Sequence, residues 1–183
     1  MGARAEATEA TRRRILEAAK ALFAERFYDE VTLDEVARRA DVTVQTVIRR
    51  FGSKEGLVDA GITDLTPVVR AQRAEAPVGD VAGAVSNLFD HYEEWGAFSL
   101  RILAQEERVP PFRRVTDGGR RLHREWVERT FAPFLAGRKG RRLAQLASLT
   151  DVHVWKLLRR DHGLERPEAE RALAEMIQAL IEA

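Results

Sequence analysis

The feature that most constrains the fold of this chain is a pair of short helices predicted between residues 32 and 51. Glu35 follows Thr32 by three residues, a spacing at which the hydroxyl and the carboxylate reciprocally accept the backbone N–H groups of a first helical turn. Val31 and Val36 stand where a hydrophobic staple would place them. A helix is therefore expected to start at Thr32.

A second helix is predicted after an interruption of only three residues, 41–43. Thr43 can cap this helix and Gly52 can end it, so we expect a span of 44–51, with Ser53 capping the helix that follows. Two helices joined by so short a turn form a helix-turn-helix, whose second helix enters the major groove of double-stranded DNA. The pattern thus predicts sequence-specific DNA binding.

The outward face of the second helix carries side chains that can read bases. Val47 and Phe51 are expected to point inward, one helical turn apart. Gln45 can pair with adenine, and Arg49 can pair with guanine or with a phosphate. The residues left outside are Val44, Gln45, Thr46, Ile48, Arg49 and Arg50.

The local charge also suits a contact with DNA. Between Arg38 and Lys54 there are five basic residues and a single acid, Asp41, although the net charge of the whole chain is +1. A positive local field favours phosphate binding. The alternative is that these arginines form only a solvated surface; two consecutive capped helices favour the DNA-binding interpretation.

Three segments carry a family resemblance: TRRRILEAAKALFAE at 11–25, then VTLDEVARRADVT and VQTVIRRFGSKEGL. This first third of the chain resembles the DNA-binding domain of the TetR (tetracycline-repressor-like) family of bacterial transcriptional regulators. The resemblance implies that four residues approach bases: Val44, Gln45, Thr46 and Arg49. It implies that four others approach phosphates: Thr32, Thr43, Arg50 and Lys54.

Three positions depart from the family pattern. Ile48 replaces a frequent tyrosine that donates to a phosphate, so one anchoring hydrogen bond is expected to be missing. Phe27 and Asp41 replace common glycines and must take the turn with a Cβ present. Such a turn is tolerable for aspartate and less comfortable for phenylalanine.

The expected fold is all-α, with a three-helix helix-turn-helix domain at 1–57 and a larger helical domain for effector binding and dimerisation at 58–183. In the larger domain, Asp80 is expected to cap a helix that runs to Trp95, and a short helix should cover 98–107. A further helix is expected to start at Pro110 and Pro111.

The last two predicted helices, 141–162 and the helix after Gly163, carry more apolar surface than one buried face requires. By the resemblance, this pair forms a four-helix dimer interface with a second copy; the alternative is a monomeric core. A dimer is favoured because one helix-turn-helix reads only a half-site. The expected interface residues are Leu146, Leu157, Leu173, Met176, Ile177 and Leu180.

Aromatic residues gather in the middle of the larger domain, where a small molecule would bind. An aromatic stripe at helical spacing is also what an ordinary core looks like, so that alternative stays open. The composition favours a mostly apolar effector. The candidate ligand-binding residues are Asn87, His91, Tyr92, Trp95, Trp126 and Thr150.

Several classes of function are not expected. Glu106 and Glu107 are adjacent and would point apart on a helix, and no nucleophile with a base or phosphate-binding glycine loop is found, so we expect no enzyme and no cofactor. His91, His123 and His153 lack the short spacing of a helical zinc site, so no metal is expected. No apolar run could cross a membrane and no signal peptide is recognised, so the expected location is cytoplasmic.

Together these features predict a homodimeric TetR-like regulator, a repressor that binds a palindromic operator and leaves it when a small molecule occupies the larger domain. The alternative is a helix-turn-helix module that binds DNA or protein and has no effector pocket.

Overall fold

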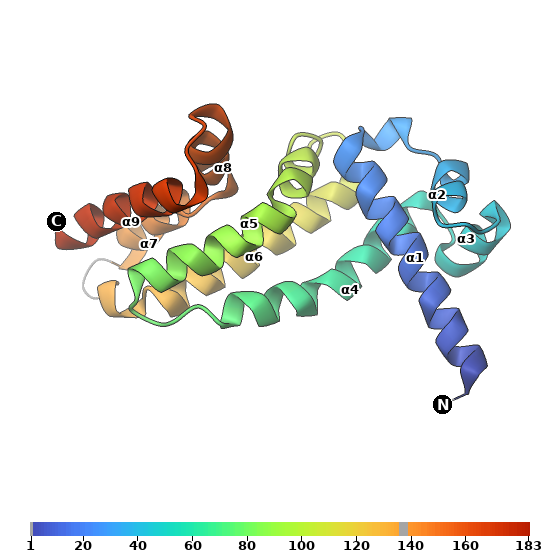
Figure 1. Cartoon of the computed structure of the whole chain (residues 1–183), viewed down its shortest axis with the longest axis horizontal. Coiled ribbons are helices and arrows are strands. Elements are labelled where there is room, and N and C mark those ends of the chain that lie inside the picture. Colours follow the sequence, from blue (N-terminus) through green and yellow to red (C-terminus); the bar gives the residue numbers. More distant parts are fainter. Residues whose placement is uncertain (1, 136–138) are drawn as a thin grey trace. The chain divides into compact units, whose positions relative to one another are not determined.

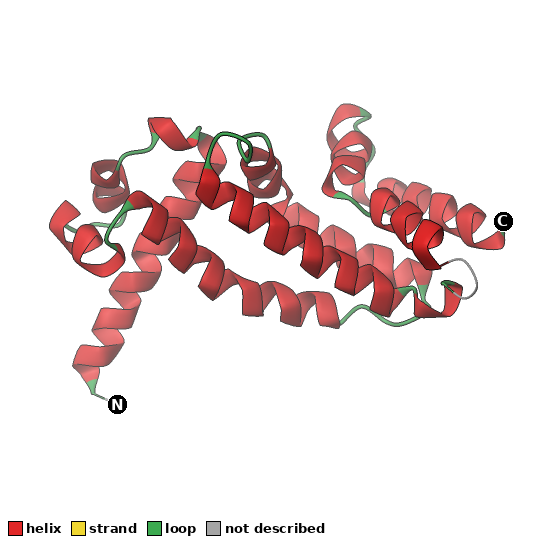
Figure 2. Cartoon of the chain, turned by 180° about the vertical axis from the view of Figure 1, so that it is seen from behind, coloured by secondary structure: helices red, strands yellow, loops and turns green. Residues whose placement is uncertain are grey.

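The computed structural model describes residues 2–135 and 139–183, and these residues are helical or form turns between helices, without a strand (Figure 2). The all-α expectation is therefore confirmed. No helix in these two ranges is both long enough and apolar enough to span a membrane.

The chain forms two compact units, which do not coincide with the boundary expected after residue 57. One unit contains residues 1–66 and 101–116, and the other contains 67–100 and 117–183. The first unit thus takes in a segment that lies far along the sequence. We describe each unit by itself.

The N-terminal unit is built on α1 (Ala3–Glu25), followed by a 3-10 turn, η1 (Tyr28–Glu30), and by α2 (Leu33–Arg39) and α3 (Val44–Phe51) (Figure 1). The helix α4 (Lys54–Ala74) begins directly after α3. Apolar residues at helical spacing meet in one core because each helix is apolar on one side. Its fully buried members include Ile15, Val31, Val36, Val47 and Leu57.

The caps of the N-terminal unit are those expected from the sequence. The Glu35 N–H donates to Thr32 Oγ1 at 3.2 Å and the Thr32 N–H donates to Glu35 Oε2 at 2.9 Å, which is a complete capping box. Thr43 Oγ1 accepts the Thr46 N–H at 3.2 Å and caps α3. Gly52 ends α3 with φ = 75°.

Of the two turn positions where the family commonly has glycine, only Asp41 takes a left-handed conformation. Asp41 takes φ = 54°, a left-handed conformation that aspartate tolerates. The expected strain at Phe27 is wrong, because its φ is −67° in extended backbone. The Phe27 ring lies instead below the Arg101 guanidinium, with 5.1 Å between the Arg101 Cζ and the ring centroid.

The second unit contains most of the C-terminal helices. The last residues of α5 (Val81–Leu103) and the first residues of α6 (Pro110–Thr130) belong to the first unit. A 3-10 turn, η2 (Ala132–Phe134), follows α6. Next come α7 (Lys139–Leu149) and α8 (Val152–Lys156). A π-helical turn, η3 (Leu157–Asp161), leads to α9 (Arg166–Glu182).

The helix start expected at Asp80 is confirmed, since Asp80 Oδ1 accepts the Gly83 N–H at 3.0 Å. The end expected at Trp95 is wrong, because α5 continues to Leu103. Gly96 does not end the helix: a Cβ built there would lie 2.5 Å from Trp155 Cζ3, so this glycine provides room for the indole ring.

The single helix expected at 141–162 is also wrong. Asp151 interrupts it by accepting the His153 N–H at 2.9 Å and capping α8. Aspartate at such a position starts a new helix because its carboxylate satisfies a free backbone donor. The expected break at Gly163 is confirmed by its positive φ of 68°.

Candidate functional site

The outward face of α3 is open to solvent. Gln45, Ile48 and Arg49 are exposed, while Val47 is 0% exposed and anchors the helix to the core. Val44, Thr46 and Arg50 are half-buried at the edges of this face. The structure therefore brings together, on one helix, the residues expected to approach bases.

The two capping threonines use their hydroxyls within the chain. Thr32 Oγ1 accepts the Glu35 N–H and donates to Glu35 Oε2 at 3.0 Å. Thr43 Oγ1 lies 3.0 Å from Thr46 Oγ1 and also accepts the Thr46 N–H. A phosphate that bound at either threonine would compete for a hydroxyl group that already caps a helix.

Glu35 is itself held by a neighbouring cation. Arg26 Nη1 lies 2.9 Å from Glu35 Oε1. This ion pair, together with the Thr32 N–H, lowers the pKa of the Glu35 carboxyl to about 2. The capping carboxylate therefore stays ionised throughout the neutral and mildly acidic range.

Lys54 lies at the start of α4 and ties two turns of the N-terminal unit together. Its Nζ donates to the carbonyls of Tyr28 at 2.8 Å and Val31 at 2.9 Å, and lies 4.1 Å from the centroid of the Tyr28 ring. Partial burial lowers the pKa of Lys54. An ammonium has three N–H donors, so one remains for a phosphate.

The arginines of this region fall into two groups. Arg39 forms a two-pronged pair with Glu25, with N–O distances of 3.0 and 2.9 Å. Arg38 and Arg49 are exposed and form no ion pair with any acidic residue in the described ranges. Their charges are therefore available to an external anion such as a DNA phosphate.

A second cluster lies inside the C-terminal unit and contains four of the residues expected to bind a ligand. The Tyr92 hydroxyl donates to the Thr150 carbonyl at 3.0 Å. His91 and Tyr92 are neighbours on α5, with ring centroids 5.3 Å apart. Trp126 on α6 stacks on His123, with centroids 5.8 Å apart.

The centre of this cluster is Arg73, a residue that the sequence analysis did not single out. Arg73 is 3% exposed, its Nη2 lies 2.8 Å from His123 Nδ1, and its Cζ lies 3.9 Å from the centroid of the Trp126 ring. Burial lowers the pKa of Arg73 to about 10, so the guanidinium is charged at neutral pH. In the sequence, Arg73 follows Val69 by four residues, so helical periodicity places it on the same face of α4 as an apolar residue but does not identify its partners.

The two histidines of the cluster are neutral. Burial, followed by the Arg73 charge, lowers the pKa of His123 to about 4 and that of His91 to about 3. His123 Nδ1 accepts from Arg73, so the proton of this neutral ring is on Nε2, which lies 3.2 Å from the Ala147 carbonyl and 3.1 Å from Thr150 Oγ1.

The other two candidates serve packing and helix pairing. Asn87 Nδ2 donates to the Gln72 carbonyl at 2.8 Å, and Gln72 Nε2 donates to the Asn87 carbonyl at 2.9 Å. This reciprocal pair joins α4 to α5. Trp95 is buried further along α5.

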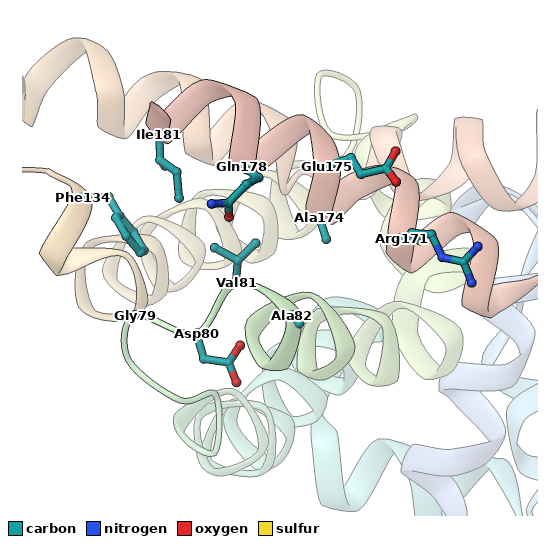
Figure 3. A pocket seen from close by; sticks show the side chains of 10 residues that line it. All are labelled: Gly79, Asp80, Val81, Ala82, Phe134, Arg171, Ala174, Glu175, Gln178 and Ile181. Carbon is teal, nitrogen blue, oxygen red and sulfur yellow. The ribbon is translucent and has the colours of Figure 1, made fainter. Parts of the chain in front are cut away.

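An open groove of about 520 Å³ lies elsewhere in the C-terminal unit, between the start of α5 and α9 (Figure 3). Asp80 and Val81 line one side, and Arg171 and Gln178 line the other (Figure 3). None of the candidate ligand-binding residues lines this groove. The groove and the aromatic cluster are therefore separate features.

The residues expected at a dimer interface divide by exposure. Leu146, Leu173 and Ile177 are fully buried within the single chain and belong to its own core. Leu157 is 47% exposed and Met176 is 37% exposed, and Leu180 is half-buried. Only the last three present apolar surface to a second copy.

No group of three or more histidine, cysteine, aspartate or glutamate side chains suited to a metal ion occurs within residues 2–135 and 139–183.

Comparison with known proteins identifies the N-terminal segment. A family model described as bacterial regulatory proteins, tetR family, matches residues 15–60. The HTH-type transcriptional regulator YvkB of Bacillus subtilis (strain 168) is 42% identical over 50 residues, which make up 27% of this chain and 26% of that regulator. The match thus spans about a quarter of this curated relative.

Solved structures resemble the whole chain. A transcriptional regulator from Rhodococcus sp. Rha1 has a TM-score of 0.75 at 17% identity, covering 93% of this chain and 96% of its own. Salmonella enterica GusR has a TM-score of 0.73 at 21% identity, with coverages of 94% and 96%. A tetR-family regulator from Streptomyces coelicolor has a TM-score of 0.72 at 21% identity, with coverages of 98% and 82%.

At these identities the structural likeness shows a shared fold. The family model covers the capped helix pair, the second half of α1 and the start of α4. Residues 15–60 therefore form a helix-turn-helix domain of the kind found in the tetR family of bacterial regulatory proteins, and the whole chain shares the fold of solved tetR-family regulators.

Proposed function

We propose that this protein regulates transcription by binding an operator through α3. The observation that carries the proposal is the exposed face of α3, where Gln45 and Arg49 point away from a core that holds Val47. A recognition helix contacts base edges with its N-terminal residues, and Thr43 fixes that end of α3 by its cap. An operator-binding protein works where the DNA is, so the proposed location is the bacterial cytoplasm.

The proposed assembly is a homodimer on a palindromic operator, acting as a repressor. A helix-turn-helix reads one half-site, and two-fold pairing of identical chains supplies the second. Exposed apolar side chains on η3 and α9, namely Leu157 and Met176, together with Leu180, support an interface there.

A small-molecule effector is the third part of the proposal. The buried cluster around Tyr92 and Trp126 combines aromatic surface with polar groups, which is typical of ligand sites. A ligand can release DNA only by binding the low-affinity arrangement of the dimer more tightly than the operator-bound one. The effector is therefore expected to bind among helices that include α4, which follows α3 in the chain.

The second candidate function is a DNA- or protein-binding module without an effector pocket. One observation favours it: Tyr92 and Thr150 already bond to each other inside the chain, as residues of an ordinary core would. A ligand that binds this cluster and releases DNA would exclude the module.

Selection from random duplex DNA tests the proposed function. The purified protein should enrich a palindromic sequence, and Arg49→Ala should fail to enrich it while keeping the wild-type melting temperature. Arg171→Ala, which changes an exposed arginine in the other unit, is the matched control and should enrich the same sequence. No enrichment by the wild-type protein would overturn the proposal.

A further inference from the structure

The buried cluster of the C-terminal unit contains a positive charge without a carboxylate partner. Arg73 is 3% exposed, and no aspartate or glutamate in the described ranges forms an ion pair with it. Nearby Arg129 adds to the positive potential, since it donates to the Arg73 and Ala74 carbonyls at 2.8 and 2.9 Å. A buried charge is normally paired, because removing it from water costs far more than one neutral hydrogen bond returns.

The hydrogen bonds of the Arg73 guanidinium are incomplete. Its Nη2 has His123 as partner, whereas Nε and Nη1 are buried and have none. The Trp126 indole nitrogen is likewise buried without a partner. These three atoms are all N–H donors that lack an acceptor. The side-chain oxygens of Gln72 and Asn87, on α4 and α5, are buried acceptors that likewise have no partner.

Among the described residues, no hydrogen bond joins Arg73 Nε, Arg73 Nη1 or the Trp126 indole nitrogen to an acceptor. His123 and His91 are neutral, and His91 Nδ1 is also without a partner. The face of Trp126 lies 3.9 Å from Arg73 Cζ and the Tyr92 ring lies 5.9 Å from it, and both compensate the charge only in part. The cluster therefore keeps a net positive charge among aromatic rings.

We propose that this cluster binds the carboxylate group of an effector with an apolar, aromatic body, and that Arg73 is the residue that recognises it. A carboxylate accepts hydrogen bonds only, so it matches the unfilled donors of Arg73 and Trp126. The body of the ligand would lie against Trp126 and Phe131, whose rings are 5.7 Å apart and nearly perpendicular. The proposal rests on the proposed function and gives its effector a chemical class.

A ligand that enters among these side chains has to move them. Arg73 lies one residue before the end of α4, the helix whose first residue, Lys54, holds the carbonyls of Tyr28 and Val31. A carboxylate that draws Arg73 toward itself therefore acts on the same helix that adjoins the recognition helix. Release from DNA requires that the ligand bind two arrangements of the chain with different affinities, and a ligand-driven shift of α4 would provide that difference.

The test compares acids with their uncharged amides on the full-length protein. The probes are benzoate, phenylacetate, indole-3-acetate and octanoate, each paired with the corresponding amide, and the readouts are calorimetric affinity and release of a fluorescent operator. We expect an aromatic acid to bind about 10- to 100-fold more tightly than its amide, because a hydrogen bond to a charged group is lost in the amide.

Two variants locate the effect. Arg73→Met should abolish the preference for the acid. Arg70→Met should keep it, because Arg70 lies on the same helix as Arg73 but is exposed and pairs with Glu125 of α6 at 3.0 Å. The melting temperature of ligand-free Arg73→Met should equal or exceed that of the wild type, because an incompletely paired buried charge is removed. Arg73→Lys keeps a charge and should retain part of the preference even if Arg73→Met fails to fold.

The proposal would be overturned if acids and amides bound with equal affinity, or if Arg73→Met bound the acids as the wild type does. It would also be overturned if none of the four acids bound at millimolar concentration. Calorimetry requires no DNA, so it tests the carboxylate site separately. Failure of the wild-type protein to bind any operator would overturn the proposed function and leave the calorimetric result standing.

Discussion

Gln45 and Lys54 differ in what their side chains can contact. Gln45 is exposed on α3, while Lys54 directs two of its donors to the backbone carbonyls of Tyr28 and Val31. Gln45 is therefore suited to read a base. Lys54 stabilises the N-terminal unit and has one donor left for a phosphate. The two residues should affect DNA binding in different ways.

We expect Gln45→Ala to lose about 1–3 kcal/mol at one operator position and to relax the base preference there. Lys54→Ala should weaken operator and random DNA alike. The measurement is fluorescence anisotropy on the operator, on its single-base variants and on random duplexes. An equal loss on operator and random DNA for Gln45→Ala would show that Gln45 does not read a base.

The buried histidines make stability depend on pH. Their ordinary pKa of 6.5 is lowered by burial to about 4 for His123 and about 3 for His91. Below pH 6.5 the unfolded chain therefore takes up protons that the folded chain does not. The free energy of unfolding should fall as the pH decreases from 6.5 toward 4, by up to about 1.4 kcal/mol per pH unit for each histidine.

Urea unfolding of wild type and His123→Asn between neutral pH and about pH 5 checks this expectation, because aspartates and glutamates titrate mainly below that range. The variant should show a shallower pH dependence than the wild type. His162→Asn, at an exposed position, is the matched control and should follow the wild type. The same pH dependence in all three proteins would contradict the assignment of a neutral buried His123.

Individual residues differed in how far the sequence could predict their roles. The capping box of Thr32 and Glu35 was predictable because both partners lie within one helical turn. Arg73 was not, because its partners His123 and Trp126 lie far along the sequence and only the folded chain brings them together. The exposed face of α3 was predictable because helical periodicity alone separates Val47 from Gln45.

At the scale of helices, local signals located the starts better than the ends. Asp80, Thr43 and Ser53 each cap a helix where expected. A break was expected around Gly96, yet α5 continues through this residue. The glycine is explained instead by packing, because it leaves room for the Trp155 ring of α8. A packing contact of this kind leaves no mark on the local sequence pattern, so tertiary structure decided the outcome.

The packing of α5 against α8 gives a prediction at this scale. Gly96→Ala would place a Cβ 2.5 Å from the Trp155 ring and should destabilise the protein by about 1–3 kcal/mol through overpacking. Gly119→Ala, inside α6 and with nothing within 4 Å of its added Cβ, should instead stabilise by about 0.5–1 kcal/mol. Urea unfolding of both variants measures the difference, and equal effects would contradict the described contact.

At the scale of the whole molecule, the dimer depends on apolar surface that a single chain leaves exposed. Met176→Glu would place a charge on the exposed side of α9 and should split the dimer while each chain stays folded. Leu173→Glu differs because its side chain is buried in the chain itself, so it should unfold the protein.

Sedimentation velocity at micromolar concentration, with circular dichroism for folding, distinguishes these outcomes. Gln178→Glu, at an exposed position of the same helix, serves as the control and should remain dimeric. A monomeric wild-type protein, or a dimeric Met176→Glu variant, would show that this face of α9 is not the interface.

The central claim is that two copies of α3 read a symmetric site in DNA, and a footprint on the selected operator tests it most directly. We predict two protected half-sites whose centres lie about 10–10.5 base pairs, or a multiple of that, apart on the duplex. Single-base changes in one half-site should weaken protection of both, because the dimer binds as a unit. Uniform protection of random DNA, or a single protected half-site with no symmetric partner, would contradict the account.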